Sequence, residues 1–185
     1  MTFAPDSIGA QSAWLDVAWH NTGGPVGVQQ VPITATSTGI VQTDLLIKGK
    51  GAGVVGEGVL STTGTNQVVK SKSKPGRKAV FQFTVQNDGT VKDSFLVHGA
   101  SKKRGFSLTY LLDGPAPVDI TAAITGGGYL LPGVTAGGTR VIRLVVKLKD
   151  NVKVGVVQSW LVGVTSMTDP SKRDAVLAKV KVVKP

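Results

Sequence analysis

The chain has 185 residues, a formal net charge of +10 and a hydrophobic fraction of 41%, which is ordinary for a globular core. It contains 24 glycines, 9 prolines and one glutamate, Glu57, a composition that disfavours helices and suits strands joined by tight turns. No cysteine is present, which excludes disulfides, thiol nucleophiles and thiolate metal sites. The composition therefore predicts an all-β protein.

The first 40 residues differ from the rest of the chain, because they hold two of the three tryptophans, Trp14 and Trp19. We expect strands at about residues 12–19 and 26–36, the second limited to a sheet edge by Pro32. The phrase ITATS at residues 33–37 is similar to GVTSM at residues 163–167. Residues 1–40 are therefore interpreted as the tail of a preceding repeat or as extra N-terminal strands, and residues 41–185 as the main domain.

The centre of the chain is the stretch KAVFQFTVQNDGTVKDSFLVH at residues 78–98. Two apolar runs with period-two alternation meet at the turn residues Asn87, Asp88 and Gly89, which tolerate left-handed backbone angles. The pattern predicts a β-hairpin. Its apolar positions, Phe81, Phe83, Val85, Phe95 and Val97, are the predicted core.

Further strands are predicted wherever apolar and polar residues alternate between turn residues. They cover residues 41–48, 106–112, 118–124, 139–149, 156–166 and 174–183. The glycines of residues 126–128 and the pair Pro132–Gly133 are expected to break the chain between the third and fourth of these strands.

Basic residues are the main candidates for a binding site. Lys70, Lys72 and Lys74 have a spacing of two, so in an extended segment they share one face, which either guards an edge strand or contacts a polyanion. If residues 139–149 and 174–183 lie in one sheet, their outward lysines and arginine build a basic stripe. The candidate polyanion-binding residues are Arg143, Lys147, Lys149, Lys179, Lys181, Lys70, Lys72, Lys74, Arg77 and Lys78.

Catalytic chemistry has little support in the sequence. The two histidines, His20 and His98, have no metal-ligand spacing, and no nucleophile-elbow phrase is present. Trp14 and Trp19 are five apart, so on a straight strand they point to opposite faces and cannot form one stacking platform. We therefore predict no catalytic, cofactor-binding or metal-binding residues, and no cofactor.

The order of several phrases resembles a known group of domains. These phrases are VQTDLLIK, FQFTVQNDGTVKDSFLV, LPGVTAGGTRVIRLVV and LVGVTSMTDPSKRDAVLAKV, spread over residues 41–180. They resemble the immunoglobulin-like accessory and adhesion domains of secreted bacterial proteins, of the cell-adhesion-related and alpha-galactosidase-associated kinds. The resemblance implies an immunoglobulin-like antiparallel β-sandwich, here with additional N-terminal strands, that serves as a non-enzymatic spacer, stalk or adhesion module.

Two functions follow as hypotheses. The first is a structural or interaction module of an extracellular or cell-surface assembly, such as a surface layer or filament, that associates with itself or with neighbouring domains. The alternative is a module that binds an acidic polysaccharide or nucleic acid through a basic sheet face, as the net charge suggests. No signal peptide pattern and no run of 18 apolar residues occur in the chain, so we expect no membrane span.

Overall fold

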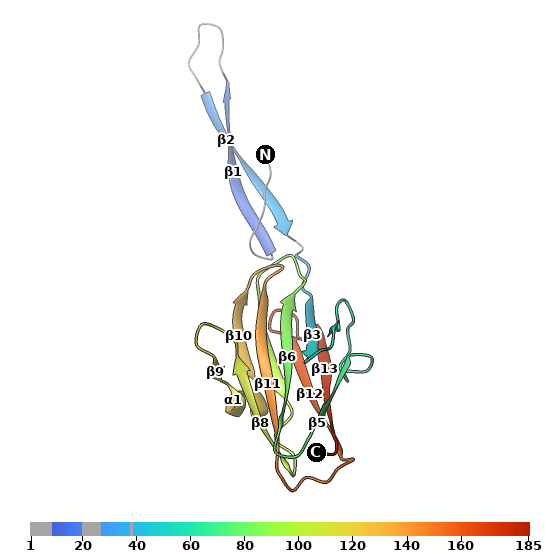
Figure 1. Ribbon diagram of the computed structural model, residues 1–185. Coiled ribbons are helices and arrows are strands. Elements are labelled where there is room, and N and C mark those ends of the chain that lie inside the picture. Colours follow the sequence, from blue (N-terminus) through green and yellow to red (C-terminus); the bar gives the residue numbers. More distant parts are fainter. Residues whose placement is uncertain (1–8, 20–26, 38) are drawn as a thin grey trace. The chain divides into compact units, whose positions relative to one another are not determined.

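The computed structural model describes residues 9–19, 27–37 and 39–185 (Figure 1). The chain divides into two compact units, Met1–Ile40 and Val41–Pro185. The first unit is built from one pair of strands, and the second is a β-sandwich.

The first unit is a long antiparallel hairpin of β1 (Gly9–Trp19) and β2 (Gly27–Ser37). The two strands pair over their whole length without a register shift, from Gly9 opposite Ser37 to Trp19 opposite Gly27. Pro32 lies in the middle of β2, and within the described residues β2 pairs with β1 alone. The edge position predicted from this proline is therefore confirmed.

The second unit consists of two packed sheets. The five-stranded sheet has the order β10 (Tyr129–Val134), β7 (Asp93–Gly99), β12 (Val157–Ser166), β13 (Arg173–Val182) and β5 (Val68–Ser73). The six-stranded sheet has the order β4 (Val54–Val55), β3 (Thr43–Gly49), β6 (Lys78–Asn87), β11 (Thr139–Leu148), β8 (Phe106–Leu112) and β9 (Val118–Asp119).

This arrangement confirms the predicted all-β sandwich. The order β3-β6-β11-β8 corresponds to strands A, B, E and D of an immunoglobulin domain, and β7-β12-β13 corresponds to C, F and G. All pairings are antiparallel except that of β5 with β13, which is parallel. The sandwich is immunoglobulin-like in its sheet order.

The core lies between the two sheets. The side chains predicted to fill it, Phe81, Phe83, Val85, Phe95 and Val97, are all completely buried. Fully burying an aliphatic or phenylalanine side chain contributes roughly 1.5–3 kcal/mol relative to leaving it exposed. The alternation in β6 and β7 therefore identified the main core residues correctly.

The predicted pairing of these two strands as a hairpin is wrong. β6 belongs to the six-stranded sheet and β7 to the five-stranded sheet, so the turn after Asn87 carries the chain across the core. The buried Asn87 amide stabilises this crossing, because its Nδ2 donates to the carbonyl oxygens of Val91 and Val134, each at 2.9 Å. Its Oδ1 accepts a bond of 3.0 Å from the Gly89 N–H. The turn residues located the chain reversal but carried no information about which sheet the next strand joins.

The strand predicted at residues 118–124 is also wrong. Only Val118–Asp119 is extended, and the short helix α1 (Thr121–Thr125) follows. Ile120 and Ile124 are both buried, and a spacing of four places two residues on one face of a strand or of a helix. The apolar pattern could not separate the two structures. Within the described residues, no helix is long and apolar enough to cross a membrane.

The chain break predicted at Pro132 and Gly133 is instead part of β10, an edge strand of the five-stranded sheet. The pairing of β10 with β7 shifts register between Leu131 and Val134, as at a β-bulge. A proline is tolerated at such a position, because an edge strand leaves one row of backbone donors unpaired.

Candidate functional site

The structure separates the ten predicted polyanion-binding residues into three groups. β11 and β13 lie in different sheets, so the basic stripe expected from these two strands does not form. The sheets pack face to face, and their outer sides point away from each other. Four lysines lie on the five-stranded sheet (Lys70, Lys72, Lys179, Lys181), three residues lie on β6 and β11 (Lys78, Arg143, Lys147), and three lie in connections (Lys74, Arg77, Lys149).

The first group forms a compact arrangement that we call the lysine square, made of Lys70 and Lys72 on β5 and Lys179 and Lys181 on β13. In the parallel register, Lys70 lies opposite Lys179 and Lys72 lies opposite Lys181. Val69 on β5 and Ala178, Val180 and Val182 on β13 are buried at alternating positions, so all four lysines face outward from the same side of the sheet. The sequence grouped these lysines differently, because strand pairing over long distances leaves no local signal.

The positive charge of the second group, on the six-stranded sheet, is partly neutralised by an acidic side chain. The Arg143 Nε donates to Asp113 Oδ1 in an ion pair, the only ion pair among the described residues. Lys147 lies directly opposite Lys78 on β6 and opposite Ser107 on β8. This face therefore carries a lysine pair and a compensated arginine.

The third group lies where three connections meet, namely β5–β6, β7–β8 and β11–β12. The Leu148 N–H donates to the Arg77 carbonyl, and the Lys149 N–H donates to the Gly105 carbonyl, each at 2.9 Å. Asp150 is the one acidic residue of the three connections. Residues 102–104 are not among the predicted binding residues, although three consecutive basic residues were a usable signal in the sequence. The exposed basic residues at this end are Lys74, Arg77, Lys102, Arg104, Lys149 and Lys153.

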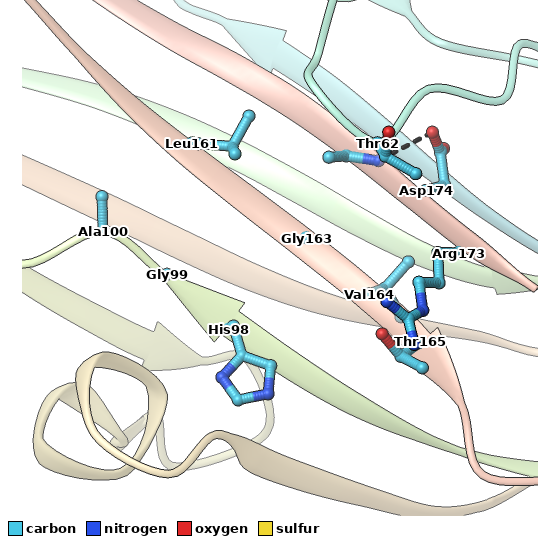
Figure 2. A pocket seen from close by; sticks show the side chains of 11 residues that line it. Thr62, His98, Gly99, Ala100, Leu161, Gly163, Val164, Thr165, Arg173 and Asp174 are labelled. Atoms are coloured by element: carbon cyan, nitrogen blue, oxygen red, sulfur yellow. Dashed lines mark hydrogen bonds between the residues drawn. The ribbon is translucent and has the colours of Figure 1, made fainter. Parts of the chain in front are cut away.

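A shallow groove of about 390 Å³ crosses the outer face of β7, β12 and β13 (Figure 2). Figure 2 shows His98, Leu161 and Arg173 around the middle of β12, at Gly163. A Cβ on Gly163 would meet the Ala175 Cβ at 3.8 Å, an ordinary contact, so packing within the chain does not require a glycine here. The groove is open, and its lining is mainly small and apolar.

A buried acidic pair, Asp44 and Asp174, lies beside this groove. Asp44 is completely buried and Asp174 is 1% exposed. The pKa of Asp44 is raised to about 6, mainly by burial and also by a hydrogen bond and charge repulsion from Asp174, against the lowering effect of the Gly58 N–H. Apart from the raised pKa of Asp44, the pair does not resemble a catalytic dyad, because the two carboxylates bind backbone N–H groups of the chain that covers them.

This pKa predicts how stability depends on pH. The native Asp44 binds its proton more tightly than the unfolded chain does, so it favours folding at low pH and loses this contribution as pH rises through about 6. Denaturant unfolding at about pH 4.5 and pH 7.5 measures the effect against Asp44→Asn, which cannot titrate. The stability of the wild type relative to this variant should fall as pH rises. A constant difference would contradict the raised pKa.

In the part of the chain that the structure describes, no three His, Asp or Glu side chains converge on a site that could hold a metal ion. Asp93, which follows the turn at residues 87–89, accepts hydrogen bonds from the hydroxyls of Ser166 and Thr168. His20 lies outside the described residues. His98 is exposed at the rim of the groove.

The hairpin of the first unit exposes large apolar side chains on both of its faces. Trp14 and Val28 lie on one face and are 67% and 61% exposed. The other face carries Leu15 opposite Val31, with Val17 and Ile33 on the same side. On the first face, between Trp14 and Val28, the Gln30 Nε2 donates to Asp16 Oδ1 at 3.0 Å.

Comparison with known proteins gives no family. No family model matches the chain, and no curated protein matches it. A family 123 glycoside hydrolase from Clostridium perfringens is similar in structure, with 8% identity and a TM-score of 0.46 over 78% of this chain. The chain spans about 28% of the length of that hydrolase.

Two further solved structures are also similar to this chain. The N-terminal domain of PorA has 13% identity and a TM-score of 0.41, covering 75% of this chain and 96% of that domain. BcpA, the major pilin subunit of Bacillus cereus, has 12% identity and a TM-score of 0.32, covering 92% of this chain and 47% of the pilin. At such low scores the likeness assigns neither a family nor an activity, and the resemblance to bacterial accessory domains stays a prediction.

Proposed function

We propose that this chain is a non-enzymatic interaction module that assembles with further copies of itself through the free edge of β1. The observation that carries the proposal is the apolar, two-stranded hairpin. A hairpin of two strands is marginally stable in water on its own, and it gains stability when further strands or another layer cover it.

The two edges of this hairpin are not equivalent. β2 contains Pro32, which removes one backbone donor and limits further pairing on its free edge. β1 contains no proline, lysine or arginine, and its pairing with β2 has no bulge. Edge strands of soluble proteins usually carry such protection against pairing with another chain. Within the described residues β1 pairs with β2 alone, so its other edge can accept a strand.

A second copy of the chain offers a matching strand. Antiparallel pairing of β1 with β1 about a two-fold axis makes a four-stranded sheet from two hairpins and uses the same surface on both partners. The apolar faces of the two hairpins then become continuous, which increases the area available for packing. The extracellular or cell-surface location rests on the family resemblance and is part of the proposal.

The oligomeric state tests this proposal. Sedimentation velocity over a wide range of micromolar concentrations should show the full chain passing from monomer to dimer or larger species. Trp14→Lys with Val17→Lys, which places a charge on each face of β1, should shift the chain to monomer, because edge lysines oppose strand addition.

A matched control separates the hairpin from net charge. Leu60→Lys with Val118→Lys adds the same charge at apolar positions of the sandwich that are 56% and 54% exposed. This variant should associate like the wild type. A wild type that stays monomeric throughout, or a control that dissociates equally, would overturn the proposal.

A further inference from the structure

The lysine square places like charges directly opposite each other on neighbouring strands. Lys70 faces Lys179, and Lys72 faces Lys181. Neighbouring strands are about 4.8 Å apart and alternate residues along a strand about 6.6 Å apart, so four positive charges share a small flat area. Like charges in such positions destabilise a sheet.

Among the described residues, the strand neighbours of the lysine square carry no acidic side chain. On β12, the residues opposite Lys179 and Lys181 are Ser159 and Val157. Along the strands, the next outward pair toward the groove is Leu177 opposite Val68. Among the described residues, none of the four lysines takes part in an ion pair. No ion pair within the described part of the chain therefore offsets the repulsion between these lysines.

Protection of a sheet edge explains only half of the square. β5 is the edge strand of its sheet, so Lys70 and Lys72 can guard it against pairing with another chain. β13 lies between β12 and β5 and has no free edge. Lys179 and Lys181 therefore have no edge to guard, and a solubility role does not require them to face two other lysines.

We propose that the lysine square binds an acidic polysaccharide, a site that goes beyond the assembly role proposed for the hairpin. A chain carrying regularly spaced carboxylate or sulfate groups can lie flat along β5 and β13 and relieve the repulsion. The open side of β5 leaves room for it, and Lys74, which follows on from β5, extends the positive surface.

The surroundings of the square favour a polysaccharide over nucleic acid. Single-stranded nucleic acids are usually held by exposed aromatic rings, and the described aromatic residues of β7 and β12, Phe95 and Trp160, are completely buried. Duplex DNA is read by elements that enter its grooves, whereas this surface is a flat sheet face. A thin, extended chain is the better fit.

Binding to heparin, a sulfated polysaccharide, tests the site directly. The variant Lys70→Gln, Lys72→Gln, Lys179→Gln, Lys181→Gln should bind heparin about tenfold or more weakly at about 0.1 M salt, with a smaller salt dependence, because fewer counterions are released. The control Lys48→Gln, Lys50→Gln, Lys92→Gln, Lys172→Gln removes the same charge from exposed positions elsewhere and should lose much less affinity. Binding to duplex DNA of similar charge is measured in parallel.

The binding and unfolding measurements can each overturn the proposed site. Equal losses in the two variants would mean that net charge alone is responsible, and would overturn the site. Tighter binding of duplex DNA than of heparin at the same salt would overturn the polysaccharide class. Thermal unfolding at low salt gives a second readout, because removing the square should leave the fold as stable as the wild type or more stable. A less stable variant would contradict the proposed repulsion.

Discussion

Asp174→Ala is expected to destabilise the sandwich by about 3–5 kcal/mol, because it leaves several buried donors without an acceptor. Asp174 Oδ1 accepts the N–H groups of Ser61 at 2.8 Å and Ala175 at 2.7 Å, and the Gln67 Nε2 at 2.7 Å. Its Oδ2 accepts the Leu45 N–H at 2.8 Å. One carboxylate thus joins β13, β3 and the loop at residues 56–67, and chemical denaturation measures its contribution.

Asp174→Asn is the control for this experiment. The asparagine oxygen can keep the bonds made by Oδ1, and the amide NH₂ can donate to the neighbouring carboxyl of Asp44. This variant should lose less than half as much stability as the alanine variant. Similar losses for both would show that the charge of Asp174, rather than its acceptors, holds the loop.

Trp160→Ala should cost about 3–5 kcal/mol, since it empties a large volume in the core. Trp160 is completely buried on β12, and its ring meets that of Phe106 edge to face, with centroids 5.4 Å apart. The Lys103 Nζ lies 5.9 Å from the centre of the Trp160 ring, in a cation–π contact. Unfolding by urea with two independent probes gives the free energy and tests two-state behaviour.

The variant Trp160→Phe separates the effect of side-chain volume from the effect of the polar indole N–H. The Trp160 Nε1 is buried and has no hydrogen-bond partner among the described residues, so removing it relieves an unsatisfied donor while most of the ring volume remains. We expect the free energy of unfolding of this variant to fall by less than about 1.5 kcal/mol. A loss as large as that of the alanine variant would mean that the indole N–H is satisfied in solution.

Alternation in the sequence predicted which side chains face the core but not which strands pair. It placed Phe81, Phe83, Phe95 and Val97 correctly, because a period of two is a local property of each strand. It could not show that β6 and β7 lie in opposite sheets, since the turn at residues 87–89 suits a hairpin and a crossing alike. Pairing depends on contacts between distant residues.

For the candidate site, too, the sequence did not show which strands pair. The outward lysines of β13 were recognised, but their neighbours proved to be those of β5 rather than the basic residues of β11. The buried Asp174 was missed, although it shares the inward parity of Val176, Ala178 and Val180 along β13. An acidic residue at an inward position was a usable signal for a buried polar network.

The parallel pairing of β5 with β13 has a consequence for how the chain folds. Val68 and Leu177 are partners although they lie about 110 residues apart, and β13 occupies an interior place in its sheet. At typical rates of synthesis of 5–20 residues per second, β5 is synthesised several seconds before its partner strand β13. Contacts of such high sequence separation slow folding. Closure of the five-stranded sheet is therefore expected to be a late step, during which nascent chains expose strand edges and depend on chaperones.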